Sequence, residues 1–176
     1  MGGGGLNHPA RNSRKGCCDM NHGAFGLTTP GELLTKMKHD YEKLKAAPFD
    51  PYLAFNFFVP AECMLDWLKP GKSNQLIREN LRNSEILLQI TSHIASGAKH
   101  FSNLSSHHVS VSDMTPSAGY FVGYFPKEAF PIGYFSQGSL VIHLAGDAEK
   151  AFGSTINAVQ LAEKVLNYWN APGKVP

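Results

Sequence analysis

The chain has 176 residues, and its charged fraction of 17% and apolar fraction of 43% are those of a globular protein with one hydrophobic core. Arg11, Arg14, Lys15 and Asp19 account for the formal charge of +2, so residues 29–176 carry no net charge. A neutral folded part has no basic field to gather nucleic acid, which excludes such binding except through a local patch.

The three cysteines do not form a disulfide framework, because Cys17 and Cys18 are adjacent and Cys63 stands alone in an apolar stretch. This usage fits a reducing compartment. Residues 1–28 are Gly-rich and polar and contain no apolar run that resembles a signal peptide. We therefore expect a disordered tail over residues 1–28, a single domain over residues 29–176, and a cytoplasmic protein.

The first helix is predicted to begin at Thr29, because the pattern Thr29-Pro30-Gly31-Glu32 is a capping box with proline at the first helical position. Pro48 disfavours helical geometry at its predecessor and ends this helix near residue 47. Its apolar face consists of Leu33, Met37, Tyr41 and Leu44.

A central helix is predicted over residues 50–68, with Asp50 as its N-cap, Pro51 in its first turn and a kink at Pro60. Apolar residues occur on nearly every face, which is typical of a helix surrounded by others. A membrane span is the rival interpretation, but the polar residues Asn56 and Glu62 would be costly in lipid.

Residues 73–101 are expected to form one long helix, or two shorter helices broken near Asn83. Small residues near its end, including Gly97, would allow another helix to approach closely. The predicted apolar stripe consists of Leu81, Leu88, Ala95 and Ala98, with Leu87, Ile94 and Phe101 beside it.

Beyond residue 104 the period changes to two, which predicts strands at residues 108–112 and 140–144, most simply an antiparallel hairpin. A Gly/aromatic arm lies between them. Its aromatic residues are Tyr120, Phe121, Tyr124, Phe125, Phe130, Tyr134 and Phe135. A closing helix over residues 154–170, capped by Ser154, completes a mainly α (α+β) fold. This fold is a helical bundle with a small antiparallel β-hairpin and a C-terminal helix.

The central helix carries a polar arc of Asn56, Glu62, Cys63 and Asp66, which spans about a third of its circumference. Glu62 and Asp66 are four residues apart, so two carboxylates share a face. In a dry cleft one of them would act as an acid or base. The favoured alternative is that the arc faces solvent, or that Asp66 caps or pairs with a neighbouring helix.

Histidines are the other candidates for chemistry. His93 and His100 lie on one helix face but too far apart to hold one metal ion, whereas His100 beside Lys99 could act as an acid or base on a phosphate ester. His143 could face one of the adjacent His107 and His108, which is a weak basis for zinc. Phosphate-binding loops, dinucleotide fingerprints and zinc-protease motifs are absent from the sequence. No metal or cofactor is predicted.

Three motifs carry a family resemblance. They are Phe55-Asn56-Phe57-Phe58-Val59 with Ala61-Glu62 and Asp66-Trp67; Ala95-x-Gly97-x-Lys99-His100-Phe101; and Leu161-Ala162-Glu163-Lys164-Val165-Leu166-Asn167-Tyr168-Trp169. Over about residues 30–170 the chain resembles a group of bacterial helical proteins to which no activity is assigned.

More loosely, it is similar to HEPN domains, helical bundles that are often ribonucleases of toxin and phage-defence systems. Their signature is an arginine four to six residues before a histidine. No histidine of this chain has an arginine four to six residues before it. Of the two residues in the signature, the resemblance therefore assigns only the histidine, to His100.

Two functions follow. The first is a non-catalytic binding or assembly module of a bacterial or phage-related system, whose arm docks a protein partner or a second copy. The alternative is a HEPN-like RNA-binding protein or metal-independent ribonuclease. There His100 would be the acid or base, Lys99 would contact phosphate, and Asp66 or Glu62 would orient His100. The neutral folded part and the missing arginine favour the first. No membrane partner is expected.

Overall fold

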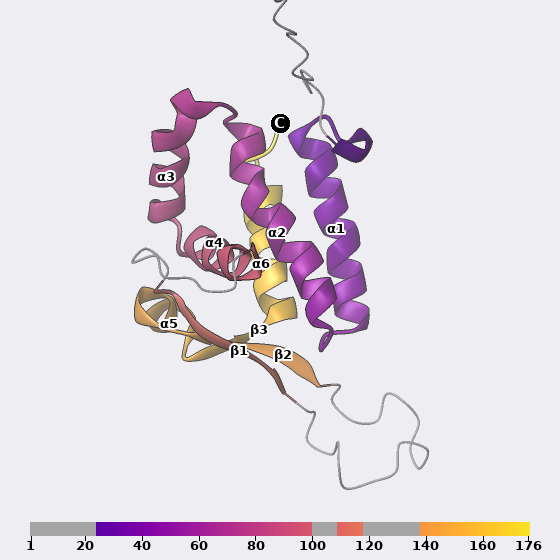
Figure 1. Ribbon diagram of the computed structural model, residues 1–176, viewed down its shortest axis with the longest axis vertical. Helices are drawn as coiled ribbons and strands as arrows, with labels where there is room; N and C mark the ends of the chain where they lie inside the picture. Colours follow the sequence, from indigo (N-terminus) through magenta and orange to yellow (C-terminus); the bar gives the residue numbers. More distant parts are fainter. Residues whose placement is uncertain (1–23, 100–108, 118–137) are drawn as a thin grey trace, which may run out of the picture.

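The computed structural model describes residues 24–99, 109–117 and 138–176, in which a helical bundle lies against a small sheet (Figure 1). The elements are α1 (Pro30–Ala46), α2 (Pro51–Leu68), α3 (Gln75–Ser84), α4 (Ile86–Lys99), β1 (Val111–Ser117), β2 (Ser139–Leu144), α5 (Gly146–Phe152), β3 (Thr155–Asn157) and α6 (Ala158–Asn170). Short 3-10 turns lie at Ala24–Gly26 and Lys72–Asn74. The predicted fold class, mainly helical with antiparallel strands and a closing C-terminal helix, is confirmed.

The predicted starts of α1 and α2 are confirmed. Thr29 and Glu32 form the reciprocal capping box, and the Asp50 carboxylate accepts hydrogen bonds from the first amides of α2. α2 continues through Pro60, which has no N–H to donate to the carbonyl of Asn56. The Nζ of Lys36 on α1 lies 3.4 Å from that carbonyl oxygen and donates to it instead.

The core lies where α1, α2, α4 and α6 meet the inner face of β2. Phe57 and Phe58 of α2 are fully buried and pack edge to face, with ring centroids 5.1 Å apart. On β2 the predicted alternation is confirmed. The other large side chains with almost no exposure are Met37, Leu44, Met64, Leu65, Leu88, Ile90, Ile142, Leu161 and Val165.

Of the two possibilities for residues 73–101, the structure has the two shorter helices, which part at Glu85. The predicted stripe is only partly correct. Leu88, Ile94 and Ala95 are buried, whereas Leu81 and Ala98 are exposed. Leu81 is exposed because of the break, since α3 turns away from α4 (Figure 1), whereas Ala98 lies near the end of α4 and lines a groove there.

The sheet has the order β1-β2-β3, so the predicted hairpin has a third strand. The first strand begins later than predicted, at Val111, and runs to Ser117. Pro116 is tolerated there because β1 is an edge strand. β3 pairs antiparallel with β2 over Thr155–Asn157, where the prediction had the closing helix already begun.

The closing helix therefore starts at Ala158, and its cap is Asn157 rather than Ser154. The Asn157 Oδ1 accepts from the amide of Gln160 at 2.8 Å. The short helix α5 was not predicted. The predicted buried stripe of α6 is confirmed and consists of Ala158, Leu161, Ala162, Val165 and Trp169.

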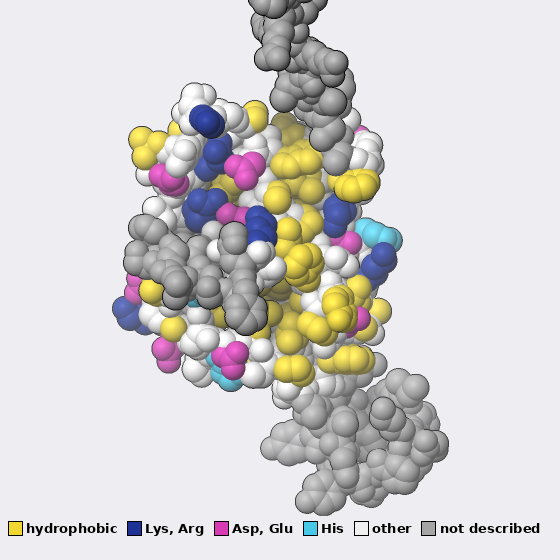
Figure 2. All heavy atoms as spheres, viewed as in Figure 1, with side chains coloured by type: hydrophobic (Ala, Val, Ile, Leu, Met, Phe, Trp, Pro, Cys, Tyr) yellow, Lys and Arg dark blue, Asp and Glu magenta, His cyan; other side chains and the backbone are white. Residues whose placement is uncertain are grey.

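α2 is not enclosed on every side, which corrects the prediction from its composition. Tyr52 is 79% exposed and Phe55 47% exposed. In the view of Figure 2, hydrophobic side chains form a column along the middle of the molecule, where Figure 1 places α2. Among the described helices, none is long and apolar enough to cross a membrane.

Candidate functional site

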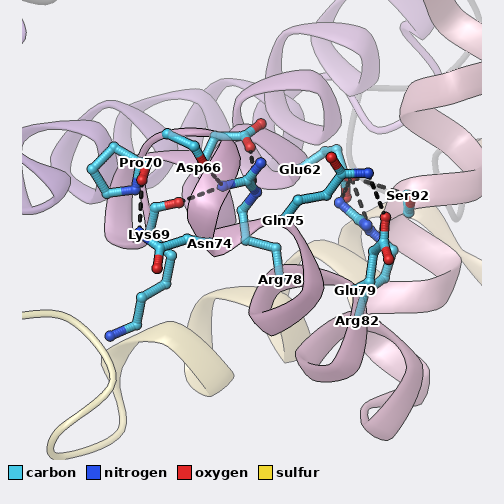
Figure 3. Close-up of polar contacts among 11 residues, drawn as sticks. Glu62, Asp66, Lys69, Pro70, Asn74, Gln75, Arg78, Glu79, Arg82 and Ser92 are labelled. Carbon is cyan, nitrogen blue, oxygen red and sulfur yellow. Dashed lines mark hydrogen bonds and ion pairs between the residues drawn. The ribbon is translucent and has the colours of Figure 1, made fainter.

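The polar arc of α2 faces two arginines of α3 (Figure 3). The Oε1 of Glu62 accepts from Nε and Nη2 of Arg82 at 3.1 and 2.7 Å, and from Oγ of Ser92 on α4 at 3.2 Å. One turn further along α2, Oδ1 of Asp66 lies 2.8 Å from Nε of Arg78. The favoured alternative, that Asp66 pairs with a neighbouring helix, describes this arrangement.

The spacing of these charges explains the pairing. Glu62 and Asp66 are four residues apart on α2, and Arg78 and Arg82 are four residues apart on α3. Residues four apart share one face of a helix, so two ion pairs form in register between antiparallel helices. This matching spacing is the signal in the sequence that would have identified the two arginines as partners of the arc.

Arg78 has a second role at the end of α2. Its Nη1 donates to the carbonyl oxygens of Lys69 and Gly71 at 2.5 and 2.8 Å. The last carbonyls of a helix lack partners within the helix, so this guanidinium satisfies groups that would otherwise need water. The C-terminal end of α2 and the start of α3 are therefore held by one side chain.

Burial raises the pKa of the Glu62 carboxyl above its ordinary value, and the Arg82 guanidinium, the Ser92 hydroxyl and the Lys99 ammonium oppose this. Burial also raises the pKa of the neighbouring Cys63 thiol, which favours its neutral form. Lys99 is exposed at the end of α4, close enough to lower both pKa values. Of the predicted catalytic residues, Glu62, Asp66 and Lys99 thus lie on neighbouring helices, and His100 is outside the described residues.

A pH dependence follows from the raised pKa of Glu62. The folded state holds this proton more tightly than the unfolded chain, so the stabilisation is complete below pH 4.5 and is lost as pH rises through the folded-state pKa. We expect Glu62→Gln to remove this decline in the free energy of unfolding. Urea unfolding of both proteins from pH 4 to 7 checks it. Parallel pH profiles for the two proteins would contradict the assignment.

His93 and His143 each connect two elements of the fold. The Nδ1 of His93 accepts from the backbone N–H of Val111 at 2.9 Å, which ties α4 to the start of β1. His143 on β2 lies beside the edge strand, with Nε2 3.0 Å from Oγ1 of Thr115. His107 and His108 are outside the described residues.

An apolar groove lies between the start of α2, the end of α4 and β1. We call it the α4–β1 groove, and its volume of about 540 Å³ is within the range of ligand-binding clefts. Its lining consists of Pro51, Ala54, Phe55, His93, Ile94, Gly97, Ala98, Val111, Ser112, Asp113, Met114, Pro116 and Leu140. The small residues near the end of α4, predicted to admit another helix, instead form part of this hollow.

Exposed aromatic side chains adjoin this groove. Phe55 lines it, and Phe49 and Tyr52 stand nearby at the start of α2, exposed by 54% and 79%. The sequence did reveal these residues as apolar, but it gave no sign that they face solvent. Large exposed apolar side chains near a groove are a feature of interaction sites.

The predicted docking residues of the Gly/aromatic arm, Tyr120 to Phe135, lie outside the described residues. Pro116 and Leu140, which line the groove, are close in sequence to the two ends of the segment 118–137. Comparisons with models of protein families, with curated proteins and with solved structures found no match to this chain.

Proposed function

We propose that this chain is a non-catalytic binding or assembly module that docks a protein partner through the α4–β1 groove and the Gly/aromatic arm. The observation that carries the proposal is an open apolar groove beside exposed aromatic side chains. Among the described residues of its lining, the polar side chains are His93, Ser112 and Asp113. The occupant is therefore a protein segment with large apolar side chains and little charge.

The polar arc supports the same proposal. A general base must reach the proton that it removes, either directly or through one water. The Oε1 of Glu62 accepts from Arg82 and Ser92, and the Oδ1 of Asp66 pairs with Arg78. These contacts join α2, α3 and α4, so the arc has a structural role that needs no substrate.

The test uses selection of apolar peptides from a phage-displayed random library on the full chain, followed by fluorescence anisotropy. Ala98→Leu fills the groove from an exposed helical position, where leucine is tolerated. We expect it to weaken binding of the selected peptides about tenfold to a hundredfold. Replacing residues 119–135 by a short Gly/Ser turn should also weaken binding.

Ala46→Leu is the matched control, because Ala46 is exposed at the end of α1, on another element. It should bind like the unaltered chain. Peptides that bind Ala98→Leu as tightly as the unaltered chain would show that the groove is not the docking site.

A further inference from the structure

α3 is held to the rest of the bundle by polar side chains and not by a buried apolar face. None of its ten residues is buried, and Leu76 and Ile77 are exposed by 67% and 46%. The hydrophobic core and the side chains packed around it include no residue of α3. An amphipathic surface helix normally turns its apolar face to the core, whereas here Arg78 and Arg82 face α2 (Figure 3). Burial of apolar surface therefore contributes little to the attachment of α3.

The contacts that attach α3 to its neighbours are ion pairs and hydrogen bonds. Arg82 reaches Glu62 on α2, and Arg78 reaches Asp66, whose side chain is 61% exposed. An exposed ion pair adds little to stability, because water and salt screen it. On the other side, the Nε2 of Gln89 on α4 donates to a carbonyl oxygen in the last turn of α3 at 2.8 Å. Opening α3 breaks these polar contacts and leaves the core intact.

A hollow of about 340 Å³ lies between α3 and the ends of α2 and α6. An empty space deprives the atoms that line it of dispersion contacts, so these residues gain less than they would in a packed core. Along this side α3 stands over open space. The residues that line the hollow include Leu81 on α3 together with Leu65, Leu68, Lys69, Trp169 and Lys174.

The chain can bend at both ends of α3. Gly71, just before the 3-10 turn that leads into α3, has φ +85°, a left-handed conformation that glycine adopts without strain. At the other end, Glu85 is extended, with φ −125° and ψ 110°, and separates α3 from α4. The N-cap residue Asn74 gives the first amides of α3 no side-chain hydrogen bond. Helices below about 12–15 residues are marginal in water, so α3 would unwind once released.

We propose that α3 is a strap that opens as one unit, with hinges at Gly71 and Glu85, while the other helices stay folded. The two arginine pairs close the strap. Opening uncovers the carboxylates of Glu62 and Asp66 and the apolar walls of the hollow. Segments of low local stability are those that rearrange when a protein acts. α3 does not line the α4–β1 groove, so the strap does not depend on the proposed docking there.

Amide hydrogen exchange of the full chain, followed residue by residue by NMR, tests the proposal. The amides of residues 79–84 have partners within the helix and report its opening. We expect them to share one protection factor, at least about a hundredfold below that of the most protected amides of α6. Their exchange should barely change in dilute urea, because local opening exposes little surface, whereas that of α6 should accelerate. Equal protection in α3 and α6 would overturn the proposal, as would protection that falls steadily toward the ends of α3, which indicates fraying.

Two variants separate opening of the strap from unfolding of the core. Phe57→Ala weakens the core and should speed exchange in α6 at least about a hundredfold, but leave exchange in α3 unchanged. Phe57→Leu makes the same comparison with a smaller loss if the alanine variant does not fold. Arg82→Gln, which keeps a good helix former, should speed exchange in α3 at least about tenfold.

Equal acceleration of α3 and α6 by the Phe57 variants would show that α3 unfolds only with the core, and would overturn the strap. Unchanged exchange of α3 in Arg82→Gln would overturn the role of the arginine pairs in closing it. Both outcomes are independent of peptide binding by Ala98→Leu, so the two proposals fail separately.

Discussion

Phe57→Ala is expected to lower the free energy of unfolding by about 3–5 kcal/mol, the largest effect of any change considered for this chain. Phe57 is fully buried in the middle of α2, and its ring packs edge to face on Phe58. Removing the ring loses the free energy gained by burying it away from water. It also loses the packing contacts of the ring, because the surrounding helices cannot collapse fully into the space that remains.

Phe55→Ala is the matched control, since it makes the same change two residues away on the same helix. Phe55 is 47% exposed, so its loss should cost less than about 1 kcal/mol. Urea unfolding measures both variants. Equal losses would mean that α2 is not oriented with Phe57 toward the core.

Arg82→Ala is expected to cost about 3 kcal/mol of unfolding free energy. The Glu62 side chain is 14% exposed, and Arg82 supplies two of the hydrogen bonds to its Oε1. Without the guanidinium, a carboxylate remains largely desolvated with Ser92 as its partner, and α3 loses one of its two attachments to α2.

The double variant Glu62→Leu, Arg82→Leu separates these causes. Removing both charges avoids the buried carboxylate, so it should recover most of the loss. Lys150→Ala breaks a fully exposed pair with Asp147, and should leave stability essentially unchanged. A double variant less stable than Arg82→Ala would contradict the buried-charge explanation.

The sequence predicted those parts of the fold that depend on local chemistry. The capping box at Thr29, the Asp50 cap and the alternation on β2 each involve residues within one turn or one strand, and the structure has all of them. The prediction of the buried stripe of α6 was also correct, because a helix with a single apolar face is stable only with that face packed on the core.

The errors arose where tertiary contacts decided the conformation. Residues 155–157 form a strand because β2 offers an edge, although the same residues could have begun a helix. Leu81 was assigned to the core because its spacing continued the stripe of α4. The break at Glu85 and the arginine pairs placed it on the surface instead.

The candidate site was predicted only in part. The shared face of Glu62 and Asp66 followed from their spacing, but their partners lie on another helix, and pairing between helices depends on how the helices pack. The α4–β1 groove was not predicted because it is formed by four elements, α2, α4, β1 and β2, that are separate in sequence. The small residues at Gly97 and Ala98 were noted, but their spacing does not distinguish a hollow from a helix contact.

The proposal that this chain binds and does not catalyse is tested most directly by incubating the purified full chain with a mixed RNA pool in chelator, beside His100→Ala. We predict that neither protein cleaves the RNA. Cleavage by the unaltered chain that is lost in His100→Ala would contradict the account, because it would establish a metal-independent ribonuclease centred on His100.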